Sequence, residues 1–154
     1  MPQTTEAVAS ACGKIEISTS ADCADPTDIS GSVQSVSVAG QARMSGEVYT
    51  FDGDYAIIRT GKREPLELTF NIVYTDEVAE AFEIARGIFE TIDCDSEICV
   101  IWSPAGGAVG DQEFTASGYL INFMYPPMDA SSGDPIMCDF VIKAAKVTAS
   151  VVSS

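Results

Sequence analysis

Hydrophobic and polar side chains alternate along several short stretches of this chain, a period that is typical of β-strands with one buried face. The clearest alternation covers 66–74. One face is apolar and consists of Leu66, Leu68, Phe70, Ile72 and Tyr74. The other face is polar and consists of Glu67, Thr69 and Asn71. Further strands are predicted at 14–18, 32–38, 98–103, 113–125 and 136–151. The pattern therefore predicts a chain that is mainly β.

One stretch, 76–90, changes to the helical period. Its apolar stripe consists of Val78, Ala81, Phe82, Ala85, Ile88 and Phe89. Thr75 precedes it as a candidate N-cap. Two acidic residues occupy the first turn, where their negative charge interacts favourably with the positive end of the helix dipole. We expect a single helix that packs over a sheet.

The stretch 46–61 predicts an extended hairpin, because Asp-Gly at 52–53 lies between two runs of β-branched and aromatic residues. Exposed apolar residues at this density are typical of a surface that meets a partner. The residues expected there are Tyr49, Phe51, Asp52, Gly53, Asp54 and Tyr55.

The last two predicted strands are long, and much of their length is apolar or small on both faces. Two explanations remain open: a second copy covers the other face, or the sheet is wholly internal. We expect one domain over 1–154, a length that can bury a core, with an N-terminal arm at 1–12.

Charge is strongly unbalanced, with 23 acidic residues against 8 basic ones and a formal net charge of −15. Binding to DNA of any sequence needs basic side chains that displace counterions from phosphate. The composition therefore excludes a DNA-binding domain and predicts repulsion from anionic membranes. No apolar run reaches the length of a membrane span.

The chain has five cysteines, at 12, 23, 94, 99 and 138, and the start of the sequence lacks the basic and apolar regions of a signal peptide. We therefore expect reduced cysteines and stability that does not depend on reducing agent. Cys94 and Cys99 lack the CxxC spacing and the histidines of a zinc site, so we expect no metal.

The sequence contains few of the side chains and motifs that catalysis or cofactor binding requires. The chain has no histidine, the usual base near neutral pH. The glycine-rich stretch 106–111 lacks the Gly-Lys-Ser/Thr ending of a phosphate loop. The acidic stretch 93–97 lacks the glycine that a calcium loop requires at its sixth position. We expect neither an enzyme nor a cofactor.

The order of elements resembles the tail tube (major tail) proteins of long-tailed bacteriophages. The resemblance runs over about 27–150: Thr27-Asp-Ile-Ser-Gly-Ser-Val, the 46–54 hairpin, Thr60-Gly-Lys-Arg-Glu-Pro-Leu-Glu-Leu-Thr-Phe, the helix, Trp102-Ser-Pro-Ala-Gly-Gly, Phe114-Thr-Ala-Ser-Gly-Tyr and Asp129-Ala-Ser-Ser-Gly-Asp-Pro before a last strand. Its specificity lies in order and spacing, because each motif alone is weak.

The resemblance implies a β-sandwich or barrel whose strands close into a ring with those of other subunits. It implies stacked hexameric rings that form a tube in the virion tail, assembled in the host cytoplasm. A tape-measure protein and a tail terminator would be partners, and double-stranded DNA would pass through without specific binding. Glu67, Thr69 and Asn71 would line the lumen or the outer wall, and the hairpin residues would join stacked rings.

Two other interpretations fit the pattern. A β-sandwich adhesion module that binds a carbohydrate or a protein through acidic loops would explain the strands and the acidity. A tail terminator or a baseplate tube protein would share the same fold.

Overall fold

The computed structural model describes residues 3–4, 6–20, 22–91 and 97–153. Its elements are the 3₁₀ turn η1 (Ser10–Cys12), α1 (Ala81–Phe89) and the strands β1 (Lys14–Ser18), β2 (Thr27–Asp28), β3 (Val33–Val38), β4 (Arg43–Val48), β5 (Ile57–Arg63), β6 (Leu66–Val73), β7 (Glu97–Ser103), β8 (Gln112–Phe123) and β9 (Met137–Val151). The expectation of a mainly β chain with one α-helix is confirmed for these residues.

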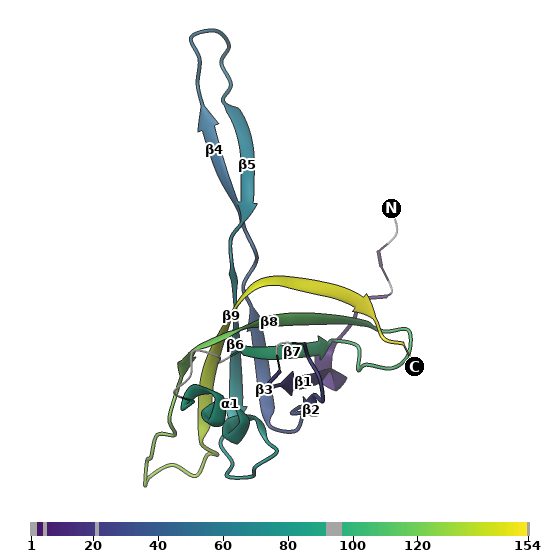
Figure 1. Cartoon of the computed structure of the whole chain (residues 1–154), viewed down its shortest axis with the longest axis vertical. Coiled ribbons are helices and arrows are strands. Elements are labelled where there is room, and N and C mark those ends of the chain that lie inside the picture. The colour runs from purple at the N-terminus through teal and green to yellow at the C-terminus, as the bar shows by residue number, and fades with distance from the viewer. Residues whose placement is uncertain (1–2, 5, 21, 92–96, 154) are drawn as a thin grey trace.

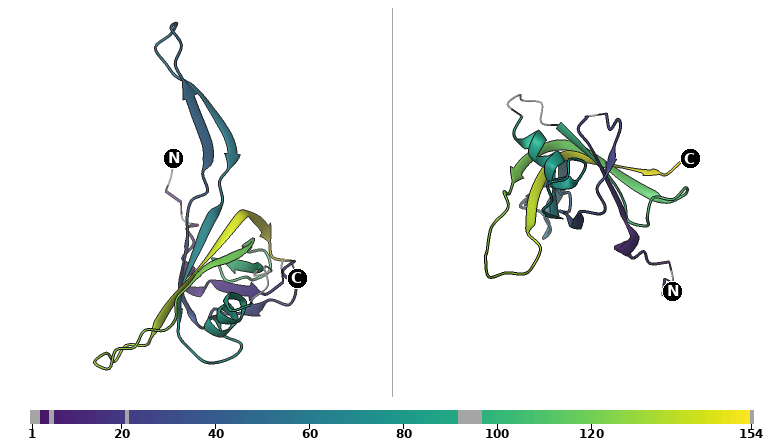
Figure 2. Two further views of the ribbon diagram at one scale, coloured as in Figure 1. Left: turned by 60° about the vertical axis from the view of Figure 1, so that its left-hand side comes forward. Right: turned by 90° about the horizontal axis from the view of Figure 1, so that it is seen from below.

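Seven of the strands form one antiparallel sheet in the order β2-β1-β7-β8-β9-β6-β3. The sheet curls into a half-barrel, so that α1 lies at its concave side (Figures 1 and 2). The register of β8 against β9 shifts at two places, between Ala116 and Gly118 and between Leu120 and Asn122. Such bulges bend strands and increase their twist, which helps the two longest strands to follow the curl.

The core lies inside this curl. On β6 the residues Leu66, Leu68, Phe70 and Ile72 are fully buried, as the alternation predicts. The ring of Phe70 stacks on Phe140 of β9 at 4.7 Å between centroids. The helix closes one side, and Phe82 packs edge-on against Tyr74. Burial of these side chains is the main favourable term in folding.

Helix α1 begins five residues later than the sequence pattern predicts. Glu80 has an extended backbone (φ −103°, ψ 167°) and precedes the first helical residue. The hydroxyl of Thr75 donates a hydrogen bond to the Glu80 carboxylate rather than to the helix backbone. Val78 consequently lies outside the helix and is 84 % exposed.

Strands β4 and β5 form a separate two-stranded sheet that projects far from the body (Figure 1). None of their residues is buried. A hairpin without a hydrophobic face to pack on is marginal on its own in water. No helix among the described residues is long and apolar enough to cross a bilayer.

The expectation that all cysteines are reduced is wrong, because Cys23 and Cys99 form a disulfide with their Cα atoms 5.3 Å apart. The segment after β1 turns back over β7 and carries Cys23, in a left-handed backbone conformation (φ 62°), to Cys99. Cys12 is exposed and Cys138 is buried, and both are free thiols. Cys94 lies outside the described residues.

Candidate assembly surfaces

The tip of the hairpin holds the six residues that sequence analysis assigned to an interface. Tyr49, Phe51, Asp52, Gly53, Asp54 and Tyr55 all lie in the connection between β4 and β5, and all are exposed. Gly53 has a φ of 92°, a conformation that favours glycine, and so allows the turn. The hydroxyl of Thr50 donates to the Asp52 carbonyl at 2.7 Å. The structure thus gathers these residues, while their role in an interface stays a prediction.

The exposed apolar side chains of the hairpin are too many for an ordinary solvent-facing loop. Tyr55 is 90 % exposed, and the Phe51 ring is fully open to solvent. Tyr49 at the tip is exposed as well, and four more lie on the strands: Met44, Val48, Ile57 and Ile58. Exposed apolar side chains that gather on one element are typical of sites of protein association.

A side chain anchors the foot of the hairpin to the body. The amide nitrogen Nε2 of Gln41 donates to the carbonyl of Glu64 at 2.9 Å and to the carbonyl of Ala145 at 2.8 Å. One side chain therefore ties both arms of the hairpin to β9, and the hairpin leaves the body in a defined direction.

The second surface is the face of the half-barrel opposite α1, here called the open face. On β6 it carries Glu67, Thr69 and Asn71, the first exposed and the others half-buried. In register with them on β9 are Lys143, Val141 and Asp139. The Oδ1 atom of Asn71 is buried and has no hydrogen-bond partner among the described residues.

The open face continues across β8 and β7. Tyr119 lies in register between Lys143 and Glu97, and its hydroxyl donates to the Glu97 carboxylate at 3.0 Å. Tyr119 and Ile121 are each about half exposed, at 47 % and 48 %. The face is therefore mixed, with apolar side chains among polar and charged ones.

Sequence reasoning missed that a loop covers part of this face. Cys99 lies on the open face in register with Ser18 and Ser117, yet it is fully buried. The segment that carries Cys23 lies over it, and the Ser18 hydroxyl donates to the Ala24 carbonyl at 2.6 Å. The alternation of β7 contained a signal for this loop. It places Cys99 on the same face as Glu97, and cysteine side chains are usually buried.

Among the unpaired strand edges of the described chain, those of β3 and of the end of β9 belong to the large sheet and are several residues long. β3 forms the last strand of the sheet and pairs only with β6. β9 pairs with β6 only as far as Ala144, so its second half, residues 145–151, pairs with β8 alone. Free edges of this length present backbone groups to a further strand.

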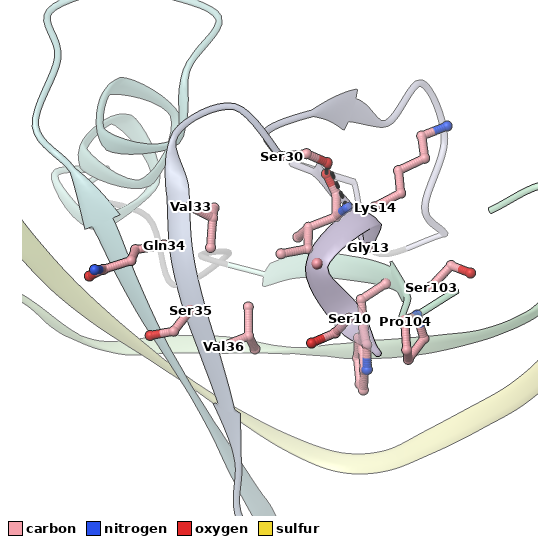
Figure 3. A pocket seen from close by; sticks show the side chains of 13 residues that line it. Ser10, Gly13, Lys14, Ser30, Val33, Gln34, Ser35, Val36, Ser103 and Pro104 are labelled. Atoms are coloured by element: carbon pink, nitrogen blue, oxygen red, sulfur yellow. Dashed lines mark hydrogen bonds between the residues drawn. The ribbon is translucent and has the colours of Figure 1, made fainter. Parts of the chain in front are cut away.

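A cavity of about 500 Å³ lies where the two ends of the half-barrel approach each other (Figure 3). Val33 and Val36 of β3 face η1 and the start of β1 across it. Lys14 is the one ionisable residue of its lining, and a hydrogen bond from Lys14 to Glu16 raises the pKa of the ammonium group. The residues that line this cavity therefore include no pair of ionisable side chains.

Comparison with solved structures shows the fold. The chain is similar to a chain of the extracellular contractile injection system PVC, in its extended sheath–tube complex, with a TM-score of 0.74 and 15 % identity over 96 % of this chain and 94 % of that one. It is also similar to a chain of the anti-feeding prophage tube-terminating cap, with a TM-score of 0.72 and 13 % identity over 98 % and 96 %.

A third similar structure is the tail of the empty GTA particle, refined with C6 symmetry, with a TM-score of 0.60 and 10 % identity over 99 % of this chain and all of that one. No family model and no curated protein matches the sequence. The chain therefore has the tail-tube type of fold, and the resemblance to tail tube proteins is supported at the level of fold.

Proposed function

We propose that this chain is a structural tube subunit of a phage-like tail, which closes into hexameric rings that stack through the hairpin. The observation that carries the proposal is the hairpin β4–β5, which packs on nothing in its own subunit and exposes Tyr49, Phe51 and Tyr55. A subunit of an adjacent ring would bury these side chains. The fold shared with chains of a sheath–tube complex supports this assignment.

The free edges support ring closure. β3 of one subunit and residues 145–151 of the next would pair and extend the sheet around the ring. Because the two edges belong to different parts of the chain, such contacts are heterologous and close only for a suitable rotation. The C6 symmetry of the similar GTA tail supports six subunits.

The open face would then line the channel, with Glu67, Thr69 and Asn71 toward its contents. Six subunits of charge −15 give a ring of strongly negative charge, which favours passage of DNA without binding. A tape-measure protein would fill the channel before DNA, and a terminator would end the tube. The tube would belong to the virion tail, after assembly in the host cytoplasm.

A second candidate is a cap or terminator ring on the same tube. Its support is the similarity to chains of a tube-terminating cap and of a sheath/tube terminator, the latter with a TM-score of 0.67. Copy number per particle separates the two roles, because a terminator occurs in one ring and a tube protein in many.

Replacement of Val48–Ile58 by a short Gly-Ser link tests the proposal. The hydrophobic core contains no hairpin residue, so the variant should keep a native circular dichroism spectrum and lose tubes in electron micrographs. Asp52→Asn with Asp54→Asn is the control, because it keeps every apolar side chain and should keep tubes. Normal tubes from the shortened chain would contradict stacking through the hairpin.

A further inference from the structure

Basic residues are concentrated at one end of the molecule. Six of the eight lie on the hairpin or beside its foot, a group here called the basic collar: Arg43, Arg59, Lys62, Arg63, Lys143 and Lys146. Lys143 and Lys146 flank Ala145, the residue whose carbonyl holds the foot of the hairpin. The collar therefore surrounds the point where the hairpin leaves the body.

None of the six collar side chains forms an ion pair with a described residue. The ion pairs of the described chain involve Lys14 and Arg86, which lie elsewhere. Arg43 and Arg59 donate instead to backbone carbonyls, of Gly61 at 3.3 Å and Ile58 at 2.9 Å. Five acidic residues share this stretch, Glu47, Asp52, Asp54, Glu64 and Glu67, and none of them forms an ion pair with a described residue either. The collar cations are therefore available to carboxylates of another subunit.

The opposite end of the molecule is acidic. Figure 1 shows the hairpin at one end of the longest axis and α1 with the β8–β9 connection at the other. That end, here called the acidic pole, has one basic residue, Arg86, and eight acidic ones: Asp76, Glu77, Glu80, Glu83, Glu90, Asp129, Asp134 and Asp139. Hydrogen bonds from Ser131 lower the pKa of Asp129, which keeps that carboxylate charged.

Both ends also expose apolar side chains. At the acidic pole Met128 is 93 % exposed, Val78 is 84 % exposed and Tyr125 is 53 % exposed. Together with the aromatic residues of the hairpin, they give each end an apolar area beside exposed charges, which are mainly carboxylates at the acidic pole and include six cations around the hairpin foot. Each end of one copy therefore complements the opposite end of another.

We infer that the basic collar of one copy docks against the acidic pole of the copy above it, so that rings stack head to tail through complementary charge. The inference rests on the proposed function, and it names the surface that receives the hairpin end. Such a contact is heterologous, so repetition gives an open stack of one polarity. It also offsets the repulsion between rings of high negative charge.

Charge exchange between the two ends tests this pairing. One variant carries Lys62→Glu and Arg63→Glu, and the other carries Asp76→Lys and Glu77→Lys; these side chains are exposed and form no hydrogen bond or ion pair with a described residue. Each variant alone should form rings without tubes. An equal mixture should recover tubes of wild-type yield, because each variant then meets a ring of complementary charge on both sides.

The variant with Asp76→Lys and Glu77→Lys also separates the proposed pairing from an effect of net charge. It changes the formal charge from −15 to −11, so a general repulsion between rings would make it stack better than the wild type, whereas the proposed pairing makes it stack worse. Tubes from either variant alone, or a mixture no better than its components, would overturn the charge pairing. Wild-type protein without rings would instead contradict the proposed function on which the inference rests.

Discussion

Gly118 lies where β8 packs tightly against β9 in the half-barrel. A Cβ atom at this position would overlap the carbonyl of Lys143 on β9. The two strands can therefore approach only because residue 118 lacks a side chain, and the register shift beside it depends on the same contact. A bend of the longest strand pair thus rests on one glycine.

We predict that Gly118→Ala lowers the free energy of unfolding by about 1–3 kcal/mol, the usual cost of overpacking a tight site. Gly87 of α1 is the matched control, because a Cβ there meets nothing within 4 Å. Gly87→Ala should stabilise the protein by up to about 1 kcal/mol through helix propensity. Urea unfolding measures both, and equal effects of the two substitutions would show that β9 does not crowd Gly118.

Glu67 is the charged residue of β6 on the open face, and it allows a test of whether that face lines a channel. It is exposed and lies opposite Lys143 in the register of β6 and β9. Glu67→Lys places two like charges side by side, at a cost of roughly 0.2–1 kcal/mol, so the fold should persist.

If the open face lines the channel, Glu67→Lys slows DNA release at low salt, because the new cations attract phosphate. The effect should fade near physiological ionic strength, where screening acts over about 8 Å. Release kinetics of particles that carry the variant measure it, and Glu67→Gln, which adds no cation, is the control that should keep nearly the wild-type rate. Unchanged release at low salt would place Glu67 away from the channel.

A disulfide bond holds the loop between β1 and β2 in place. The disulfide links Cys23 to Cys99, 76 positions apart in the sequence, and fixes the loop over the open face. A crosslink of this span restricts the unfolded chain far more than the folded one. Bonds of this kind persist in oxidising surroundings.

We predict that Cys23→Ser lowers the free energy of unfolding by about 2–4 kcal/mol in the absence of reducing agent. Reduction of the wild type should lower its melting temperature in the same way and leave that of the variant unchanged. Cys12→Ser is the control, because Cys12 is an exposed free thiol. A wild-type melting temperature that is insensitive to reduction would contradict the crosslink.

Some helices and strands can be predicted from the local pattern of apolar and polar residues, and others cannot. β1 has the predicted bounds, and β6 buries the predicted face, because the period of two directly reports the side of a strand. The start of α1 and the strand β2 were missed, since Thr75 contacts Glu80 and β2 spans only two residues. The Cys23–Cys99 pair was missed because it depends on how a turn-rich loop crosses a distant strand.

Of the candidate surfaces, the hairpin could be predicted from local sequence, whereas the basic collar could not. The sequence identifies the hairpin and its tip, because an Asp-Gly turn between aromatic runs is a local signal. The basic collar required the structure, since Lys143 and Lys146 are about 80 positions from Lys62 and Arg63 along the chain. The pairing of β6 with β9 brings the two segments to the same end of the molecule.

At the scale of the whole molecule, three features of one subunit have no partner within it. They are the projecting hairpin, the unpaired edges of β3 and β9, and a charge separated into a basic collar and an acidic pole. In the proposed assembly, ring closure would use the two edges, and the stacking of rings would use the hairpin and the charges. One assembly therefore accounts for all three.

The central claim is that this chain assembles with itself into six-membered rings. Electron microscopy of the purified protein, with sedimentation of the same sample, tests it most directly. We predict rings or tubes with six-fold symmetry and a smallest assembled species near 98 kDa, six times the 16.3 kDa subunit. A monodisperse 16.3 kDa monomer at every concentration and salt condition, with no ring in any micrograph, would contradict the account.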